Sequence, residues 1–470
     1  MEKITSASQA ISLIKANSSV MISGFLGVGA PLLLIEELVQ SGVDGLTLIQ
    51  SVASFPGEVH DIDKLFENHQ VKKFIGAHIG TSKHLVDQFN AGTLEVEFCP
   101  MGTLVERIRA AGSGLGAVVT PVGVGTQQEE NNQKIEIDGK EYLLYKPLAA
   151  DFSLIKGFKA DKTGNIVLAG TSKSSALEMA LAGKTVIAEV DEVVETGEIA
   201  PDNVDIPGIL VDYLVLGNTL AERRKYFQDL WSRNKMLRKM EQKQKATQRE
   251  GYTMNAVEII ARRIGQEFKD GMVVNLGFGI PNQAANFIPT GVNVVLQAEN
   301  GALRFGQTPT METADPDLGN SGGAPITLLP GASTFDMTTS FAIIRGGHVD
   351  MTVLGALEVD QEGNIANWMI PGSFTPGMGG AMDLLVGAKK VIASIKHVDK
   401  KGNSKVLKKC KLPLSAKQVV NLIVTDLAVF EVCPEGLVLT ETAPGVSVAE
   451  ILEKTDADVI VSETLKEMEI

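Results

Sequence analysis

The sequence has few of the residues that build metal centres and disulfide frameworks. Only three cysteines occur among 470 residues, and they are widely separated (Cys99, Cys410 and Cys433). The six histidines form no HxH or HxxxH motif. We therefore expect no metal site. We also expect a reducing compartment, either the cytoplasm or the interior of an organelle.

Long apolar runs are missing as well. No stretch approaches the ~20 consecutive apolar residues of a membrane span. The N-terminal residues MEKITSASQAISLIKANSS lack the apolar segment of a secretory signal. The net charge of −14 argues against nucleic acid as a partner, although backbone amides can still hold a small anion. We expect a cytoplasmic protein that binds neither a membrane nor nucleic acid.

The chain is long enough for two or more domains, and its pattern indicates a duplication. The segment DFSLIKGFKADKTGNI, from Asp151, matches DMTVLGALEVDQEGNI, from Asp350. Each predicts a buried strand, a short second strand and an Asp-x-x-Gly-Asn turn. Two further pairs of segments match, SGFLGVGAP with LGFGIP and GKTVIAEV with GAKKVIASI, and the three pairs occur in the same order in both halves.

The alternation of strands and helices in each half predicts two homologous open α/β domains with mainly parallel sheets. We place the domains at residues 1–220 and 251–470. Residues 221–250 hold ten basic and four acidic side chains and predict an exposed helical linker. Ligands of such sheets bind beyond the carboxyl ends of the strands, so one site shared by the two domains is expected.

Two glycine loops suggest dinucleotide binding but do not meet its pattern. A third glycine is required three positions after Gly29 and Gly279, where Leu32 and Asn282 stand instead. What remains is a strand, a glycine-rich turn and a helix start marked by proline. The unpaired amides of such a turn could hold an anion or a developing oxyanion.

The stretch VVLQAENGALRFG places a carboxylate, Glu299, at the tip of a predicted strand and directly before an Asn-Gly turn. Together with this stretch, several motifs resemble the family I coenzyme A transferases. The first half resembles their α subunit through HIGTS, PMGTLVERIRAAGSGLGAVVTPVGVGT and LAADFSLIKGFKAD. The second half resembles their β subunit through VNLGFGIPNQAANFI, AENG, ADPDLGNSGG, FAIIRGGHVD, NIANWMIPG and GMGGAMDL.

The resemblance implies a role for each matching residue. Glu299 matches the nucleophile of the ENG motif. Asn275 matches an asparagine that donates to the oxyanion or orients the carboxylate, and Gly277 and Gly279 belong to the same GFGIP loop. Gly380 and Ala381 match a loop that lines the pantetheine and offers amides to the thioester oxygen. His348 and Asp350 of the RGGHVD motif are expected to be structural, because the exchange needs no general base.

The predicted acid pocket contains Gly27, Ser51 and Met101, and it departs from the family pattern. Members that use 3-oxo acids often carry Gln where Met101 stands, and one or two asparagines after the second strand, where this chain has Gln50, Ser51 and Val52. An apolar wall discriminates weakly between acids. Our hypothesis is that acetate or butyrate is preferred over acetoacetate.

The implied activity is transfer of CoA between short-chain acids, with no cofactor beyond the CoA substrate. The resemblance also implies a homodimer or tetramer. Two alternatives stay open at this point: an acyl-CoA thioester hydrolase and a catalytically silent CoA-binding protein.

Overall fold

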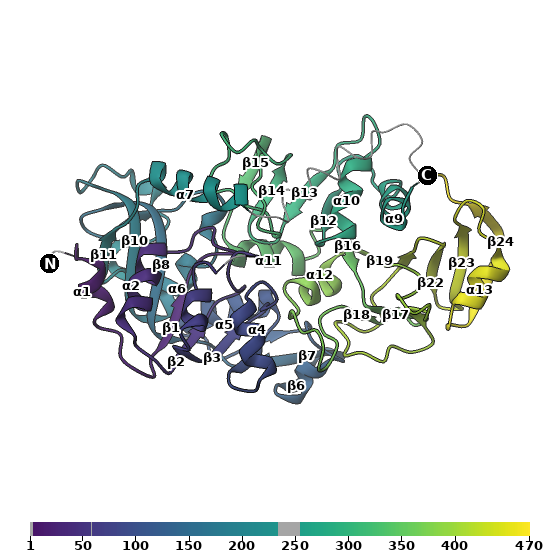
Figure 1. Cartoon of the computed structure of the whole chain (residues 1–470), viewed down its shortest axis with the longest axis horizontal. Helices are drawn as coiled ribbons and strands as arrows, with labels where there is room; N and C mark the ends of the chain where they lie inside the picture. Colours follow the sequence, from purple (N-terminus) through teal and green to yellow (C-terminus); the bar gives the residue numbers. More distant parts are fainter. Residues whose placement is uncertain (1–2, 58, 234–253) are drawn as a thin grey trace. The chain divides into compact units, whose positions relative to one another are not determined.

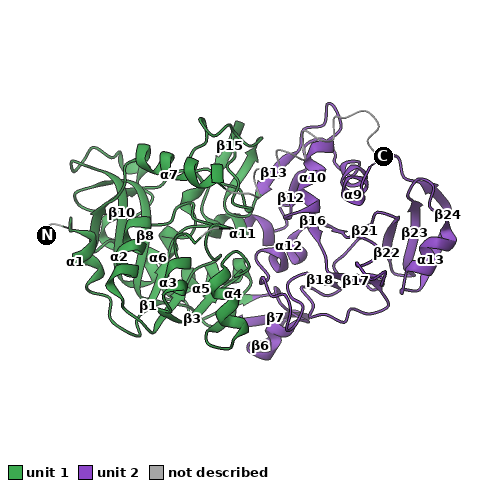
Figure 2. Ribbon diagram, viewed as in Figure 1, with its two compact units in different colours: residues 1–119, 145–247, 298–341 green, residues 120–144, 248–297, 342–470 purple. Residues whose placement is uncertain are grey.

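The computed structural model describes residues 3–57, 59–233 and 254–470 (Figure 1). The chain divides into two compact units (Figure 2). Unit 1 contains residues 1–119, 145–247 and 298–341, and unit 2 contains residues 120–144, 248–297 and 342–470. Each unit therefore draws on both halves of the sequence.

Unit 1 is built on a sheet whose strands run in the order β11-β10-β8-β1-β2-β3-β4, and all of these neighbours are parallel. The short β9 (Ile166–Val167) pairs antiparallel with β8. The bounds of the main strands are β1 Ser19–Ile22, β2 Leu46–Ile49, β3 Val71–Gly76, β4 Glu95–Phe98, β8 Ala150–Asp161, β10 Gly183–Val194 and β11 Tyr213–Leu216. The prediction of a parallel α/β sheet is confirmed.

Helices lie on both faces of this sheet. Leu154 of β8 belongs to a core that also includes apolar residues of α1 to α4, whereas the hydroxyl of Ser153 donates to the Met179 carbonyl of α6. Because successive strand residues point to opposite faces, α6 lies on the face away from α1 to α4. The helices are α1 Ala7–Ile11, α2 Leu32–Ser41, α3 Asp63–Glu67, α4 Lys83–Asn90, α5 Met101–Gly112, α6 Ala176–Ala182 and α7 Leu220–Arg233.

Residues 298–341 complete unit 1 with an antiparallel pair, β14 (Ala302–Phe305) and β15 (Leu328–Thr334). The boundary between unit 1 and the last segment of unit 2 falls within helix α11 (Met337–Arg345), after Phe341. Short 3₁₀ segments in unit 1 are η2 Gly170–Lys173, η3 Pro201–Asn203 and η4 Gly208–Leu210. The boundary between the units falls within strand β5 (Val118–Thr120), because the first segment of unit 1 ends at Val119.

Unit 2 holds a mixed sheet. Strands β13, β12, β16, β19 and β21 are parallel neighbours, β22 and β23 continue antiparallel, and β24 pairs parallel with β23. The bounds are β12 Val273–Leu276, β13 Val295–Ala298, β16 Met351–Gly355, β19 Lys390–Ser394, β21 Leu422–Val424, β22 Ala428–Cys433, β23 Gly436–Thr442 and β24 Val459–Glu467. Apolar residues of α9 pack on β12, β16, β19 and β21.

Smaller elements complete unit 2. Strands β17 (Glu358–Asp360), β18 (Ile365–Ala366) and β20 (Val406–Leu407) form a small sheet, and β6 (Gln133–Ile137) and β7 (Lys140–Tyr145) form a hairpin. The helical segments are η1 Gln127–Glu130, α9 Ala256–Gly265, α10 Ile280–Gln283, η5 Ala284–Phe287, α12 Ala381–Gly387 and α13 Val448–Lys454.

The matched segments at Asp151 and Asp350 make equivalent contacts. Each aspartate accepts a backbone N–H at the start of the neighbouring strand, from Ser19 (3.0 Å) and Val273 (2.9 Å) respectively. Each also pairs with a lysine at the start of the next parallel strand: Lys184 is the second residue of β10, and Lys389 directly precedes β19. These contacts hold the pKa of both carboxyls below the usual range. Asp350 therefore has the structural contacts expected of it.

The prediction of two successive strands is right for the second copy and wrong for the first. In the second copy the chain breaks between β16 and β17, and β17 joins another sheet. In the first copy β8 continues unbroken to Asp161, because β10 pairs with it along its whole length. The expected turn follows in both copies. Asp161 and Asp360 each accept from the N–H four residues on and from the side chain of the same asparagine.

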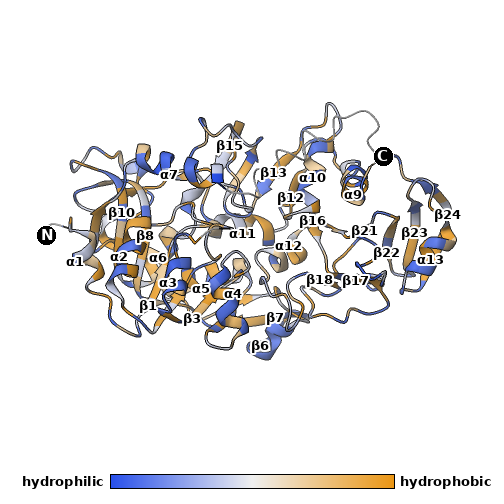
Figure 3. Ribbon diagram, in the orientation of Figure 1, coloured by the Kyte–Doolittle hydropathy of each residue, from blue (hydrophilic) through white to orange (hydrophobic). Residues whose placement is uncertain are grey.

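Helix α7 corrects the expectation of an exposed linker for residues 221–233. Phe227, Leu230 and Trp231 are buried in a cluster with Phe55 and Ala314, all within unit 1. Their spacing of three and four residues forms an apolar stripe on one helix face. The charged composition hides this stripe, and Figure 3 shows α7 largely in hydrophilic colour. Residues 234–250 of the expected linker lie outside the described residues.

Candidate active site

Glu299 lies at the tip of a strand, as the sequence predicted. Strand β13 ends at Ala298, the turn spans residues 299–301, and β14 begins at Ala302. The N–H of Gly301 closes the turn by donating to the Ala298 carbonyl at 3.0 Å. Gly301 has φ +112°, and a Cβ at this position would lie 1.9 Å from the Phe335 carbonyl oxygen. Only glycine fits there, so the backbone fixes where the half-buried Glu299 stands.

The next residue, Asn300, anchors the turn to a second loop. Its side chain is fully buried, and Nδ2 donates to the Gly319 carbonyl at 2.8 Å. Its Oδ1 has no hydrogen-bond partner among the described residues. Gly319 belongs to the ADPDLGNSGG motif, which thereby contacts the turn directly.

Asn275 lies in unit 2 on β12 and is 3% exposed. Its Nδ2 donates to both the backbone carbonyl (3.2 Å) and the side-chain Oε1 (2.6 Å) of Gln297, its neighbour on β13. Both amide protons are thus already used, which favours an orienting role over donation to an oxyanion. Either role for Asn275 stays a prediction.

The GFGIP turn follows β12 in unit 2. A Cβ on Gly277 would meet Leu354 at 2.9 Å, and Gly279 precedes α10 with φ +92°. Phe278 between them is 62% exposed. The sequence predicted a regular helix after this turn, but α10 is a single turn that passes into the 3₁₀ segment η5. Pro281 in the first turn is compatible with this start.

Gly380 and Ala381 are also in unit 2. The sequence placed both in a loop, whereas Gly380 is the N-cap of α12 and Ala381 is its first residue. Gly377 and Gly379 before them have φ +97° and +52°, so glycines shape this approach. The first helix residues have no intrahelical acceptor for their N–H groups, and that is compatible with the predicted role in holding the thioester.

The three predicted acid-pocket residues lie in unit 1. Gly27 follows β1, Ser51 follows β2, and Met101 opens α5 after β4. Because these strands are parallel, the three residues lie at the same edge of the sheet. Ser51 and Met101 are each 1% exposed, and a Cβ on Gly27 would approach His60 Nε2 to 3.1 Å.

Buried polar atoms collect at this edge. Gln50 Oε1, Ser51 Oγ and Thr103 Oγ1 have no hydrogen-bond partner among the described residues. Such atoms are costly to bury unless something pairs with them. The candidate residues therefore fall into both units: Glu299 and the pocket residues in unit 1, the others in unit 2. A site shared by the two stays a prediction.

The comparisons with known proteins agree with the motifs. The family described as Coenzyme A transferase matches residues 4–217 and 257–454. The chain belongs to this family. It is 37% identical over 483 residues to the rat (Rattus norvegicus) succinyl-CoA:3-ketoacid coenzyme A transferase 2A, covering 98% of this chain and 90% of that protein.

Two further relatives complete the comparison of this CoA-transferase. The β subunit of the Haemophilus influenzae acetate CoA-transferase is 56% identical over 217 residues, which cover 46% of this chain and 97% of that subunit. The apoenzyme structure of the acyl-CoA transferase YdiF from Escherichia coli O157:H7 covers all of this chain and 95% of its own, with a TM-score of 0.80 at 23% identity. That structure shows the shared fold.

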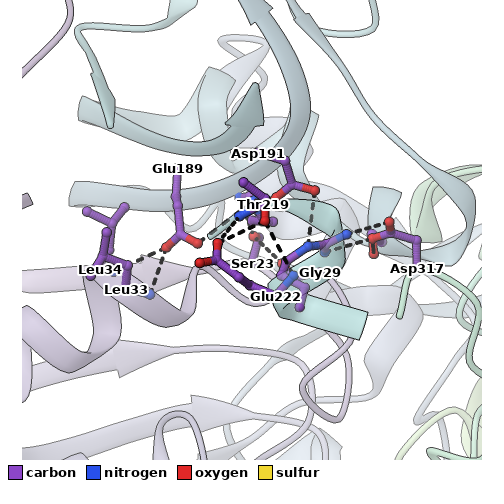
Figure 4. A network of polar contacts seen from close by, with 12 residues as sticks. Ser23, Gly29, Leu33, Leu34, Glu189, Asp191, Thr219, Glu222 and Asp317 are labelled. Carbon is purple, nitrogen blue, oxygen red and sulfur yellow. Dashed lines mark hydrogen bonds and ion pairs between the residues drawn. The ribbon is translucent and has the colours of Figure 1, made fainter. Parts of the chain in front are cut away.

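The glycine turn after β1 of the CoA-transferase corrects one expectation. The backbone N–H groups of Leu33 and Leu34, at the start of α2, donate to Glu189 Oε2 at 2.9 and 3.2 Å (Figure 4). The sequence predicted unpaired amides that could hold an anion, but a carboxylate of the chain already takes these two. At the aligned position of GAKKVIASI the second half carries Ser394.

Sequence reasoning missed the buried charges of unit 1 around Glu189. Lys156 contacts both Glu189 and Asp191, and Arg223 of α7 contacts both Asp191 and Asp317. Burial raises the pKa of Glu189 and Asp191, and Lys156 opposes that rise. Burial would lower the pKa of Arg223, but its bonds with Asp317 and the charges of Asp191 and Glu189 together raise it. The one sequence feature that pointed to these buried charges was the acidic ADPD run, which ends at Asp317.

A second missed contact lies beneath Gly27. The hydroxyl of Tyr226 on α7 hydrogen bonds with His60 Nδ1 at 2.5 Å, and His60 is 1% exposed. Burial lowers the pKa of His60 to about 3, so its ring is neutral at pH 7. Burial raises the pKa of the neighbouring Asp61 to about 8.

The described ranges contain neither a metal-binding cluster of side chains nor a helix suited to crossing a membrane. No three His, Cys, Asp or Glu side chains among those residues are grouped to hold a metal ion. In the same ranges, no helix combines the length and apolar character that a membrane crossing requires.

Proposed function

We propose that this CoA-transferase moves CoA from a short-chain acyl-CoA to an acceptor carboxylate through a glutamyl-CoA thioester on Glu299. The observation that carries the proposal is the turn at residues 299–301, where Gly301 and Asn300 fix a carboxylate at the end of a strand. A relative 37% identical over nearly the whole chain is named a succinyl-CoA:3-ketoacid transferase, which supports carboxylic acids as the substrates.

The first half-reaction makes the thioester. A carboxylate oxygen of Glu299 attacks the acyl carbonyl carbon of acyl-CoA. The C–S bond then breaks, which releases CoA thiolate and leaves a mixed anhydride. The thiolate attacks the glutamyl carbonyl carbon and forms a new C–S bond, while the bond from that same carbon to the bridging oxygen breaks and the donor acid leaves as its carboxylate.

The second half-reaction reverses these steps with another acid. The acceptor carboxylate attacks the glutamyl thioester and displaces CoA thiolate, giving a second anhydride. The thiolate then attacks the acceptor's acyl carbon, which releases acceptor acyl-CoA and the Glu299 carboxylate. Every intermediate stays activated, so the exchange needs neither ATP nor a metal. A serine would yield an ordinary ester and lose that activation.

The acceptor is proposed to be a short, unsubstituted acid such as acetate or butyrate. Met101 supplies an apolar wall, and the Ser51 hydroxyl at the same edge of the sheet supplies a donor that a carboxylate could accept from. A homodimer or tetramer and a cytoplasmic location stay predictions. The rat relative's name assigns that protein to mitochondria.

The deciding experiment is to incubate the full chain with acetyl-CoA in the absence of an acceptor acid. Mass spectrometry should find CoA on the peptide that contains Glu299, and borohydride should reduce this adduct to the alcohol. Glu299→Ala should abolish both the adduct and transfer to butyrate, and Glu312→Ala, which changes an exposed carboxylate of the same unit, should leave both intact.

Two results would reject the proposal. Continuous release of free CoA without an acceptor would identify a hydrolase. Undiminished transfer by Glu299→Ala would mean that another group performs the exchange.

A further inference from the structure

We infer that Asp317, held by Arg223 and Thr171, positions the Glu299 turn for attack without touching substrate. The inference rests on the proposed function of Glu299. It concerns four segments of unit 1: the start of α7, residues 170–175, the loop at residues 314–320 and the turn at residues 299–301.

The first step is the clamp on Asp317. Its Oδ1 accepts from Arg223 Nη1 at 3.0 Å and from Ser172 Oγ at 2.6 Å, while Oδ2 accepts from Arg223 Nη2. Two parallel N–H donors from one guanidinium fix a carboxylate in orientation as well as in place. Arg223 is 4% exposed and Asp317 6% exposed, so water competes little for either group.

The second step fixes the loop's backbone. The Asp317 carbonyl accepts from Thr171 N at 2.8 Å and from Thr171 Oγ1 at 3.1 Å. The same hydroxyl oxygen accepts from Gly319 N at 3.0 Å. Gly170 packs so closely that a Cβ there would lie 2.3 Å from the Asp317 carbonyl oxygen. Residues 170–175 therefore act as a template for the 314–320 loop.

The third step connects the loop to the nucleophile. Gly319 makes both contacts. Its N–H donates to the Thr171 hydroxyl, and its carbonyl accepts from the side chain of Asn300, the residue after Glu299. The far side of the turn is fixed as well, because Phe335 N donates to the Gly301 carbonyl at 3.1 Å and Met337 N donates to the Ser174 carbonyl at 2.8 Å. Both anchors of the turn thus end on residues 170–175.

The buried charges connect this series of contacts to the central sheet of unit 1. Arg223 also contacts Asp191 on β10, at 3.1 Å, so its single positive charge bridges the central sheet and the loop; Asp191 and Asp317 are labelled in Figure 4. A buried ion pair contributes uncertain net stability, but it selects one geometry strongly. A nucleophile that must attack, form an anhydride and be attacked again gains from such a fixed geometry, since small misplacements cost rate.

The test uses variants that keep side-chain size. Asp317→Asn removes the charge from the clamp, and Thr171→Val removes the hydroxyl that joins Asp317 to Gly319. Thr171→Ser restores that hydroxyl. Glu441→Gln is the matched control, because Glu441 receives two N–H donors from buried Arg263 in unit 2. The readouts are the single-turnover rate of thioester formation on Glu299, KM for acyl-CoA, thermal midpoints and hydrogen exchange of residues 298–305.

We expect Asp317→Asn and Thr171→Val to slow thioester formation on the order of 10- to 100-fold with KM changed less than about twofold. Both variants should also have faster hydrogen exchange at residues 298–305. Thr171→Ser should recover most of the rate, and Glu441→Gln should lower the midpoint without lowering the rate. Thr171→Val leaves the buried Arg223–Asp317 ion pair intact, so it decides the matter if Asp317→Asn does not fold.

Folded Asp317→Asn and Thr171→Val proteins with wild-type rates and wild-type exchange would overturn the inference. Failure of the proposed function gives a different result, since the wild-type chain itself would then acquire no CoA on Glu299.

Discussion

Glu189 and Leu33, 156 positions apart in the sequence, are joined by a 2.9 Å hydrogen bond from the Leu33 N–H to the Glu189 carboxylate. A helix begins with N–H groups that lack intrahelical acceptors and carry a partial positive charge. A carboxylate placed there satisfies the donors and offsets the charge. Glu189 therefore occupies the N–H groups that follow the first glycine turn, so these groups serve the fold and are not free to bind an anion.

Replacing Glu189 with Gln should lower the free energy of unfolding by about 1–3 kcal/mol. The amide oxygen can take the place of Oε2, which accepts both N–H groups, but it carries no charge, and the NH₂ group would then replace Oε1 and face the Lys156 ammonium 3.8 Å away. Thermal and guanidinium unfolding measure the loss. Glu222→Gln is the control, because Glu222 caps α7 through Thr219 in an exposed position and should matter less. An equal loss in both variants would contradict the role of burial.

Gly301→Ala should damage both stability and catalysis. The new Cβ would meet the Phe335 carbonyl oxygen at 1.9 Å in a backbone conformation that disfavours side chains, so the turn must open. We expect a loss of more than about 2 kcal/mol in the free energy of unfolding and no detectable adduct on Glu299.

Gly197→Ala separates the two causes in this experiment. Gly197 also lies in unit 1 with φ +93°, but a Cβ at this position would meet no other atom within 4 Å, so only the backbone strain applies. Its cost should be about 1 kcal/mol with the adduct retained. A Gly301→Ala protein that labels at the wild-type rate would show that the turn does not set the position of the nucleophile.

What the sequence predicted correctly depends on neighbouring residues. The turn after Glu299 needs Gly301 for its positive φ, and the turns at Asp161 and Asp360 close through side chains within four positions. Such signals can be read from a short stretch of sequence. The parallel sheets follow in the same way from alternating apolar segments.

What the sequence left hidden depends on distant contacts. The bond from Glu189 to α2 and the pair between Arg223 and Asp317 join positions 156 and 94 residues apart. No local pattern marks the first contact, and the acidic ADPD run that contains Asp317 is the only local sign of the second. The burial of α7 did have a signal, the spacing of Phe227, Leu230 and Trp231, but the charged composition around it pointed to a linker.

His397 in unit 2 should make the protein sensitive to acid. It is fully buried between the hydroxyls of Thr425 and Thr455, each 3.0 Å from a ring nitrogen, and burial lowers its pKa to about 4. The unfolded chain binds a proton near pH 6.5, and the folded chain does so only near pH 4. Stability is thus complete above pH 6.5 and is lost as the pH falls to about 4.

The expected loss from this one group is roughly 3 kcal/mol across that window. His397→Gln should show a shallower fall of unfolding free energy between pH 6.5 and 4 than the wild type, and unfolding by guanidinium at several pH values measures the difference. The exposed His348 supplies the control as His348→Gln. Parallel pH profiles for wild type and His397→Gln would refute the assignment.

Met101 should set the preference among acceptor acids. It opens α5 at the same sheet edge as Ser51 and is 1% exposed, so it adds a buried apolar side chain to the edge that also holds the Ser51 hydroxyl. A site that hydrogen-bonds a substrate group discriminates far more strongly than an apolar wall. The wild type should therefore show a higher kcat/KM for butyrate than for acetoacetate. Met101→Gln, which adds a donor, should shift that ratio toward acetoacetate by about tenfold or more.

The control is Met101→Leu, which keeps the wall apolar at similar volume and should keep the butyrate preference. Kinetics with butyrate, acetate and acetoacetate as competing acceptors give the ratios directly, with thermal midpoints to show that each variant is folded. A strong preference of the wild type for acetoacetate would end the hypothesis, because an apolar residue at position 101 would then be no obstacle to a 3-oxo acid. The Ser51 hydroxyl would in that case be the group that donates to the oxo oxygen, and Ser51→Ala would be the variant that loses this recognition.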